Sequence, residues 1–343
     1  MTATQSITIA ALDIGGANIK GVRSDGRTLC RPFALWKTPE LLRDNLERVL
    51  RHLLPFDRLV VTMTGELCDC YSSLTAGVRH ILEAVVGAAN TVAPRVAVSV
   101  WSLEGEFVEV NQAFARPRTV AAGNWLALAT WAATLAPEDN GILIDIGSTT
   151  TDFIVLQRGK PVPVGFTDTE RLQSGELVYH GVGRTPVFAL VRDVIHRDRR
   201  CRVATENFAT TLDVYLLLDD LPEGSFSDYT ADGREADRDR AMARLARVVC
   251  ADPESFTEHE ALELARQAAE AHTDLLLAAL RQVKDATATE CRFAIVSGSG
   301  EFLARRIATA AGISRILELN ARVGTESSEA ACAYALTQIA ADH

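Results

Sequence analysis

Two short segments of the sequence each place an aspartate at the end of an apolar run and small residues directly after it. The first reads Leu-Asp-Ile-Gly-Gly at residues 12–16, and the second reads Ile-Asp-Ile-Gly-Ser at residues 144–148. A hairpin turn of this kind lets main-chain N–H groups approach an anion, and the aspartate can hold a hydrated cation beside it. One such turn is a common connector, but two copies at the spacing of a domain indicate a duplicated fold.

The duplication predicts where these residues would meet. Facing lobes would place Asp13 and Asp145 across one cleft as catalytic groups and metal ligands, with Mg²⁺ between them and a polyphosphate between the two hairpins. A Gly-Ser-Gly turn at 298–300 follows a strand and opens a helix, so it could present amides to an anion or accept an adenine. The residues expected to bind the ligand are Gly15, Gly16, Asn18, Lys20, Gly147, Ser148, Thr149, Thr150, Gly298, Ser299 and Gly300.

The charge of the chain limits how a phosphate could be held. Its 343 residues include 35 Lys and Arg against 45 Asp and Glu, which gives a formal net charge of -10. Such a chain repels nucleic-acid backbones and anionic membrane surfaces, so we expect neither as a partner. Backbone N–H groups and a metal ion would therefore have to bind the phosphate.

The composition predicts a soluble, cytoplasmic protein. Apolar residues make up 48% of the chain and charged residues 23%, which is typical of a globular protein. The seven cysteines lack the spacing of a disulfide framework, and the pair Cys68 and Cys70 is better explained as incidental than as a metal site. We find no signal-peptide pattern and no apolar stretch long enough to span a membrane. The oligomeric state is left open.

Residues 1–137 alternate strands with helices and are predicted to form the first lobe of an α/β fold. A turn-rich break at 137–141 separates them from the second copy of the motif. Strands are predicted at 7–12, 19–22, 28–36, 58–63 and 96–101, and helices at 40–54, 73–89 and 120–135.

Residues 138–343 are predicted to form the second lobe, which departs from the first after its hairpin. Residues 165–185 are polar and turn-rich, and a mainly helical insertion occupies about 186–290. Within the insertion, a capping box at Thr257 and Glu260 should start a long helix. The remaining predictions are a solvated helix end at 196–200, an acidic loop at 219–240, strands at 293–296 and 316–319, and helices at 301–311 and 325–340.

Three segments resemble a known superfamily. Residues 13–16, 145–150 and 297–300 are similar to the first phosphate, second phosphate and adenosine motifs of the proteins that include actin, sugar kinases and seventy-kilodalton heat-shock chaperones. The Thr-Thr-Asp ending at 150–152 is closer to the hydantoinase/oxoprolinase branch. The resemblance implies a two-lobed, actin-like (ribonuclease H-like) fold with a cleft between its lobes. It also adds ATP as a candidate ligand and Asp152 as a ligand-binding residue.

Two further blocks resemble a narrower family. Residues 123–127 and, above all, 169–186 are similar to the condensing enzymes of methanofuran biosynthesis, which serve tetrahydromethanopterin-linked one-carbon metabolism. That family joins an aminomethylfuran-methyl diphosphate to the phenol of γ-glutamyltyramine and releases pyrophosphate. The resemblance implies a Mg²⁺-dependent transferase whose partners are a small-molecule diphosphate and a phenolic amine, either a tyramine or a tyrosine derivative.

One position departs from the sugar-kinase pattern. Those kinases carry an Asn-Asp pair at the corresponding helix start, where the aspartate serves as base, whereas here Asn124 is followed by Trp125. Asn124 remains a ligand-binding candidate. Without the carboxylate, an ordinary hydroxyl would be hard to activate, but a phenol with a pKa of about 10 demands less of a base.

Four carboxylates are candidates for proton transfer or substrate binding. Glu66 follows a strand, and Asp168, Glu170 and Glu176 lie in the polar block. They could hold the ammonium of the furan substrate or take the phenol proton, although surface carboxylates are ordinary. We consider Glu66 and Glu176 as catalytic residues and Asp168 and Glu170 as substrate-binding residues, with the general base unassigned.

Three cationic residues are candidates for binding the substrate or its phosphates. Arg171 and Arg184 could bind the diphosphate or the glutamyl carboxylates of the substrate, because a planar guanidinium suits both. Structural ion pairing explains them equally well. Lys20 could reach a phosphate, although lysines on the outer face of a strand are common.

Two other functions would use the same cleft. One is an ATP-dependent enzyme of the hydantoinase/oxoprolinase type or a small-molecule kinase. The other is a non-catalytic nucleotide-binding switch that resembles actin or the chaperones. Lobe closure on a polyphosphate would serve all three functions.

Overall fold

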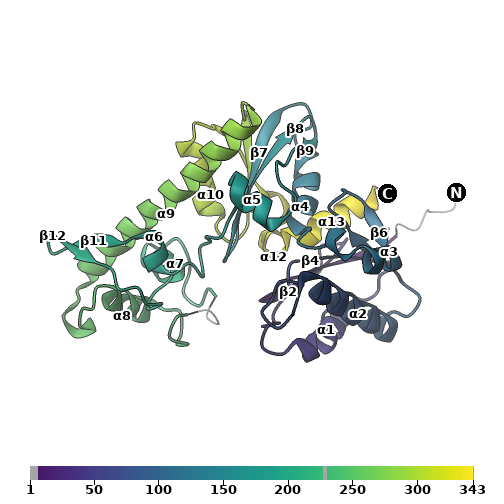
Figure 1. Ribbon diagram of the computed structural model, residues 1–343, viewed down its shortest axis with the longest axis horizontal. Coiled ribbons are helices and arrows are strands. Elements are labelled where there is room, and N and C mark those ends of the chain that lie inside the picture. Colours follow the sequence, from purple (N-terminus) through teal and green to yellow (C-terminus); the bar gives the residue numbers. More distant parts are fainter. Residues whose placement is uncertain (1–6, 227–229, 343) are drawn as a thin grey trace.

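The chain folds around two mixed β-sheets, seen in the computed structural model of residues 7–226 and 230–342 (Figure 1). The first sheet has the order β3-β2-β1-β4-β5-β6. Its first two strands form the predicted antiparallel hairpin, and β4 runs parallel to β1. The strands are β1 (Ile9–Ile14), β2 (Asn18–Arg23), β3 (Thr28–Pro32), β4 (Arg58–Met63), β5 (Ala97–Trp101) and β6 (Phe107–Glu109).

The second sheet repeats this arrangement. Its order is β10-β8-β7-β13-β14, with β9 paired to β8. Again an antiparallel hairpin, β7 with β8, is followed by a parallel neighbour, β13. The predicted duplication is therefore confirmed. The strands are β7 (Asn140–Ile146), β8 (Thr151–Gln157), β9 (Lys160–Pro161), β10 (Leu177–Val178), β13 (Phe293–Ser297) and β14 (Arg315–Glu318).

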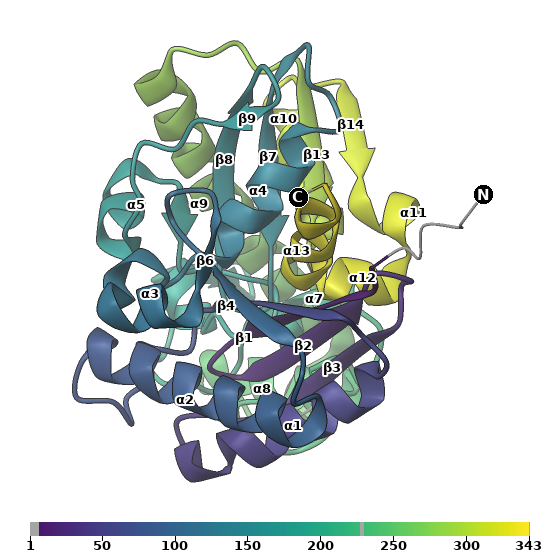
Figure 2. The same cartoon turned by 90° about the vertical axis from the view of Figure 1, so that its right-hand side faces the viewer.

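Helices cover both outer faces and fill the space between the sheets. On the outside, α1 (Leu42–Leu53) and α2 (Leu74–Val92) pack over the first sheet, and α9 (Glu258–Thr287) and α10 (Glu301–Ala310) over the second. Between the sheets, α4 (Asn124–Ala133) and α13 (Ala331–Ala341) pack against each other (Figure 2). The smaller helices of the two lobes are α3 (Val110–Ala115), α11 (Leu319–Val323) and α12 (Thr325–Glu329).

The two central helices each pack against the sheet of the other half of the chain. Helix α13, near the C-terminus, contacts β1, β2 and β4, whereas α4 contacts β8 and β9. Their apolar side chains join both sheets in one continuous core. The lobes are thus held together by exchanged helices.

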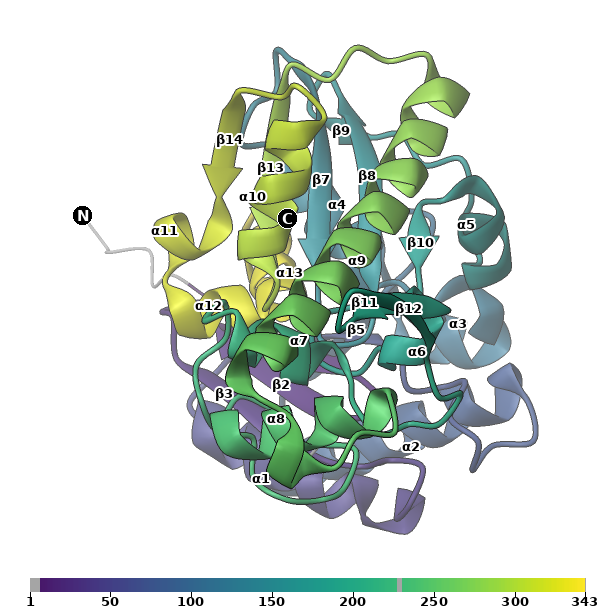
Figure 3. The ribbon, with the colours of Figure 1, turned by 90° about the vertical axis from the view of Figure 1, so that its left-hand side faces the viewer.

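The insertion in the second lobe combines helices with one β-hairpin (Figure 3). The long helix α9 begins after Thr257, whose side chain forms the predicted capping box with Glu260. The prediction of a helix end at 196–200 is wrong. Arg197 and Asp198 both have positive φ and form the two-residue turn of a hairpin, a geometry that suits twisted antiparallel strands. The other elements are α6 (Val187–Leu190), β11 (Asp193–His196), β12 (Arg199–Arg202), α7 (Thr211–Leu217) and α8 (Arg238–Val248).

Four other segments differ from the predictions. The turn-rich block at 165–185 contains α5 (Asp168–Ser174), which a capping box at Thr167 starts. The terminal helix divides into α12 and α13 at Ala330, and the helix predicted from 120 begins only at Asn124, since Ala122 has a positive φ. In the predicted acidic loop, residues 227–229 lie outside the described residues, and α8 takes over at Arg238. Within the described ranges, no helix is long and apolar enough to cross a membrane.

The packing of α13 gives a first prediction. Leu336 on this helix is fully buried in the core between the sheets, so Leu336→Ala should lower the free energy of unfolding by about 2–5 kcal/mol. Urea denaturation measures this change. Leu172→Ala is the matched control, because that leucine is 50% exposed. Equal losses in both variants would contradict a central role for α13.

Candidate active site

The two hairpin aspartates occupy equivalent positions in their sheets. Asp13 on β1 lies in register with Lys20 on β2 and with Thr62 on β4. Cross-strand partners in register share a face of the sheet, so these three side chains lie on the face that packs against α13. The first sheet therefore presents a carboxylate flanked by an ammonium and a hydroxyl.

The second sheet repeats the row with one change. Asp145 on β7 lies in register with Asp152 on β8 and with Ser297 on β13. A second carboxylate thus replaces the lysine of the first sheet. Both rows contain a hydroxyl, because Ser297 has the same position relative to Asp145 as Thr62 has relative to Asp13.

The two rows share one electrostatic environment. Burial and then the charge of Asp152 raise the pKa of Asp145 to about 6, against the opposing effect of Lys20. Burial also raises the pKa of Asp13, and Lys20 and the nearby Asn124 side chain oppose that shift. Burial alone would lower the pKa of Lys20, but nearby anionic groups, Asp13 first among them and Asp145 included, raise it overall. The structure therefore brings both predicted aspartates and Lys20 together.

Several buried oxygen atoms at this place lack a hydrogen-bond partner among the described residues. They are Oδ1 of Asp13, Oδ1 of Asp145, Oγ1 of Thr62 and Oγ of Ser297. Hard oxygen donors of this kind suit Mg²⁺, which is usually bound by one or two carboxylates together with water and substrate phosphates. In the described part of the chain, no group of three or more His, Cys, Asp or Glu residues could hold a metal. A Mg²⁺ ion at the two aspartates would therefore need ligand oxygens as well.

The turns that follow the aspartates are tight and alike. In each, the glycine N–H donates to a carbonyl three residues on, Gly15 to Asn18 and Gly147 to Thr150, both at 2.9 Å. The loop at 181–184 packs onto the second turn, and a Cβ at Gly181 would lie 2.4 Å from the carbonyl oxygen of Gly147. The hydroxyls of Ser148 and Thr149 are 3.4 Å apart on the same turn.

Glu66 is placed beside this site by the end of β4. The amides of Thr64 and Gly65 donate to the carbonyl of Ile14, which ties the segment to the first hairpin. Glu66 is 1% exposed, and its Oε2 has no hydrogen-bond partner in the described ranges. Burial raises its pKa to about 7, helped by the charges of Asp168 and Asp13. Glu66 is therefore a buried carboxyl that can exchange a proton near neutral pH.

Arg171 supports the second aspartate row. It is 2% exposed, pairs with Asp152 at 2.5 Å, and lies over the ring of Trp125 with 4.0 Å from its guanidinium carbon to the ring centroid. Arg171 thus forms a structural ion pair, and its role in substrate binding stays a prediction. Asp168 lies close by, and burial raises its pKa while the charge of Arg171 opposes the shift.

Two other glutamates have local structural roles instead of the predicted ones. The carboxylate of Glu176 accepts hydrogen bonds from the amides of Val164 and Gly165, at 2.7 and 2.8 Å, and from the Ser174 hydroxyl. It holds its own loop in place and is fully buried, so it is not positioned as a catalytic group. Glu170 caps α5 through hydrogen bonds from the amides at 166 and 167.

Arg184 connects the lobes. Its guanidinium lies over the ring of Trp36, 5.6 Å from the centroid. Burial raises the pKa of Cys68 to about 11, and the charge of Arg184 opposes that rise, so Arg184 also lies near Cys68. Both partners belong to the first half of the chain. A Cβ at Gly16 would lie 2.7 Å from the Cys68 sulfur, which places the first turn beside this contact.

The Gly-Ser-Gly turn at 298–300 packs onto the second hairpin. Gly298 has a φ of 87°, and a Cβ there would lie 2.7 Å from Oδ1 of Asp145. The Gly300 amide donates to the carbonyl of Ile146 at 2.8 Å. This amide is therefore used within the fold, and the glycines hold α10 close to Asp145.

Sequence reasoning missed three residues of the site. Thr62 was hidden in an apolar strand, and Ser297 was noted only as the start of the 297–300 motif. Only their register with the aspartates could have shown that their hydroxyls belong to the site. Cys332 on α13 has a pKa raised by burial and by the charges of Asp13 and Asp145, so it lies near both. No pattern in the sequence marks it. All seven cysteines, Cys68 and Cys70 included, are free thiols.

Comparison with known proteins identifies the family. The family model described as hydantoinase/oxoprolinase matches residues 58–343. The chain belongs to this family.

Its relatives include curated proteins and solved structures. A Methanocaldococcus jannaschii protein named (4-{4-[2-(gamma-L-glutamylamino)ethyl]phenoxymethyl}furan-2-yl)methanamine synthase is 34% identical over 264 residues, or 76% of this chain and 77% of that protein. A Methanococcus vannielii protein of the same name is 36% identical over 148 residues, or 43% of this chain and 66% of that protein. A nucleotide-free acetone carboxylase structure aligns with a TM-score of 0.53 and 10% identity, over 97% of this chain and 70% of that chain. The fold of this hydantoinase/oxoprolinase family member is the two-lobed, actin-like one.

The raised pKa of Glu66 predicts a pH-dependent stability. Between its ordinary value of 4.5 and about 7, the folded protein holds a proton that the unfolded chain releases. The free energy of unfolding should therefore fall as pH rises through this window. Glu66→Gln removes that loss. The free energy of unfolding of the variant minus that of the parent should therefore be roughly 3 kcal/mol larger at pH 8 than at pH 4.

Urea denaturation at a series of pH values in a metal-free buffer measures this difference. Glu83→Gln on the exposed side of α2 is the matched control and should follow the parent curve. Parallel curves for the parent and Glu66→Gln would show that the Glu66 carboxyl is not perturbed.

Proposed function

We propose that this protein joins the methylene carbon of an aminomethylfuran-methyl diphosphate to the phenol oxygen of γ-glutamyltyramine or a tyrosine analogue, in the biosynthesis of a methanofuran-type cofactor. Two curated relatives support this, because both are named as synthases of a phenoxymethylfuran methanamine. That product contains an ether between a phenol and a furan methylene. A synthase of such an ether must form one C–O bond and expel a leaving group.

The observation that carries the proposal is the pair of buried aspartates, with Lys20 in register with Asp13 and close enough for its charge to act on both. Asp13 and Asp145 each have a buried oxygen without a hydrogen-bond partner among the described residues, and each is followed by a glycine turn. These residues fit Mg²⁺ bound together with a diphosphate. Bound there, Mg²⁺ would neutralise charge on the departing diphosphate. Lys20 and the turn residues 148–150 would bind the phosphate oxygens.

The remaining residues suit capture by a phenol better than phosphorylation of a sugar. The position after Asn124 is Trp125, which is buried under Arg171 and offers no carboxylate. Glu66, whose pKa is raised to about 7 by burial, would accept the phenol proton. In the step, the bond from the methylene carbon to the diphosphate oxygen breaks, the carbon–phenol oxygen bond forms, and the proton passes to Glu66. An electron-rich furan stabilises the positive charge that develops on the methylene carbon.

The direct test is to supply both substrates with Mg²⁺ and no nucleotide. Mass spectrometry should detect the ether product, with one pyrophosphate released for each ether formed. Turnover only with ATP, accompanied by ADP formation, would instead favour an ATP-dependent hydantoinase/oxoprolinase-type reaction. Nucleotide binding without any small-molecule product would favour a switch.

Removal of either aspartate should abolish the reaction. Asp13→Asn and Asp145→Asn should each reduce Mg²⁺-dependent turnover by about a thousandfold or more, because each removes a charge that holds the metal. Asp44→Asn, at an exposed position of α1, is the matched control and should keep full activity. Circular dichroism checks that the variants fold. Full activity in both site variants would overturn the metal assignment.

A further inference from the structure

Asp168 is a half-buried carboxylate without a direct partner. It is the first residue of α5, and among the described residues it forms no hydrogen bond and no ion pair. The charge of Arg171 reaches it, but that guanidinium pairs with Asp152 instead, at 2.5 Å. Partial burial of an unpaired carboxylate costs free energy, so a cationic ligand would stabilise Asp168.

Glu66 approaches Asp168 from the first lobe. Burial is the main reason that the pKa of Glu66 is raised, and among charged groups Asp168 contributes most, ahead of Asp13. Glu66 is 1% exposed, and its Oε2 has no hydrogen-bond partner in the described part of the chain. Two carboxylates from different lobes therefore lie within range of each other, and no Lys or Arg is among the groups that act on Glu66. Such a place attracts a cation.

An aromatic wall borders this place. The ring of Phe166, which is 45% exposed, lies 6.5 Å from the ring of Trp125, centroid to centroid. The amide of Phe166 donates to the Glu170 carboxylate at 3.0 Å, which fixes the wall two residues before Asp168. An aromatic ring beside a carboxylate suits a flat ligand that carries a positive charge.

Asp168 also neighbours the two aspartate rows. Burial raises the pKa of Asp168, Arg171 opposes the shift, and Asp152, the register partner of Asp145, adds to it. Lys20 acts on Asp13 and Asp145 but is not among the groups that act on Asp168. A ligand that reached both places would need a negative end at the rows and a positive end at Asp168.

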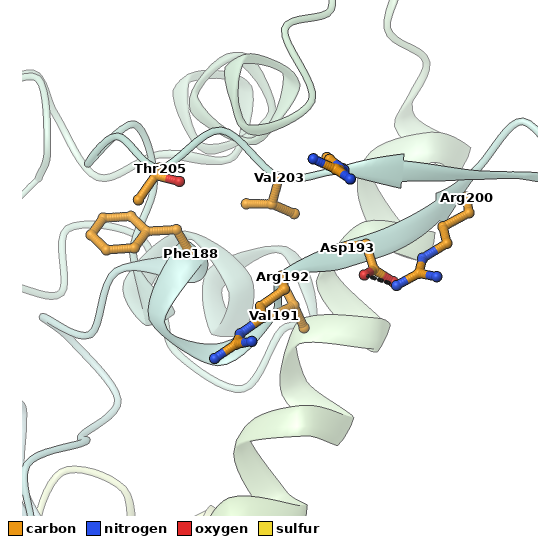
Figure 4. Close-up of a pocket in the computed structure, with 8 residues that line it drawn as sticks. Phe188, Val191, Arg192, Asp193, Arg200, Val203 and Thr205 are labelled. Carbon is orange, nitrogen blue, oxygen red and sulfur yellow. Dashed lines mark hydrogen bonds and ion pairs between the residues drawn. The ribbon is translucent and has the colours of Figure 1, made fainter.

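The cavity beside the β11–β12 hairpin does not suit a cationic ligand. It has a volume of about 480 Å³ (Figure 4). Among the described residues that line it, the one carboxylate is Asp193, which already pairs with Arg200 at 2.5 Å. Its other charged residues are Arg192 and Arg202, which would repel an ammonium group.

We propose that Asp168 binds the ammonium group of the aminomethylfuran-methyl diphosphate, with the furan ring against Phe166 and the diphosphate at Asp13 and Asp145. The identity of this ligand rests on the proposed function. The furan substrate carries a diphosphate at one end and an amine at the other, and the named product of the relatives retains the furan methanamine. The phenolic substrate also has an amine in its glutamyl group, but beside a carboxylate that Asp168 would repel. Glu66 stays available for the phenol proton.

Isothermal titration calorimetry of the furan diphosphate with Mg²⁺, in the absence of the phenolic substrate, tests this subsite without ether formation. The comparison ligand is the same diphosphate with a methyl group in place of the aminomethyl group. The parent should bind the amine at least about tenfold more tightly. Asp168→Asn should reduce this ratio to about one, whereas Asp168→Glu keeps the charge and should retain part of the preference.

Asp274→Asn, at an exposed position of α9 in the same lobe, is the matched control and should keep the parent ratio. Acidic residues at the start of a helix also stabilise the helix, so melting temperatures without ligand show whether the variants fold. Equal binding of the two diphosphates by the parent, or an unchanged ratio in Asp168→Asn, would overturn the subsite even if the ether forms.

Furfurylamine, the amine fragment without a diphosphate, separates this proposal from the proposed reaction. The parent should bind it, and Asp168→Asn should lose that binding. If binding of furfurylamine depends on Asp168 while both substrates with Mg²⁺ give no ether, the subsite is supported and the proposed reaction is wrong. If neither diphosphate nor furfurylamine binds the parent, the subsite is overturned.

Discussion

The burial of several carboxylates between two sheets is the constraint around which this structure is arranged. Asp13, Asp145 and Asp152 project toward the same buried region, and Lys20 is the cation whose charge acts on the first two. Desolvation raises the pKa of Asp13 and of Asp145, so the region is costly until a cation and an anion enter it. Unpartnered oxygens on Asp13, Asp145, Thr62 and Ser297 are what such a ligand would satisfy.

The surrounding elements keep this costly arrangement in place. The exchanged helices α4 and α13 join both sheets in one core, so neither aspartate can withdraw without disturbing both lobes. Arg171, held between Asp152 and Trp125, compensates part of the negative charge on one side. On the other side Arg184 reaches across to Trp36. Stability of the fold and geometry of the site therefore rest on the same contacts.

The anion site proposed between the sheets must overcome the net charge of the chain. A protein with a net charge of -10 repels phosphates at long range and must attract them locally. Between the sheets, backbone turns, Lys20 and carboxylates suited to a metal would provide that attraction. This site comes from the duplicated part of the fold.

The sequence by itself determined the duplication, the two aspartates and the capping box at Thr257, because these depend on local patterns that a few neighbouring residues carry. Glu66 was visible as a candidate, but its perturbed pKa was not, since desolvation depends on what packs around a group. Arg171 and Glu170 were candidates for substrate binding and Glu176 for catalysis, and only their partners in space show the contacts by which all three support the fold. The hairpin at 196–200 likewise follows from its packing on α9. Thr62, Ser297 and Cys332 join the site through strand register and through a helix that crosses from the far end of the chain. Both relations are long-range, so tertiary structure alone decided them.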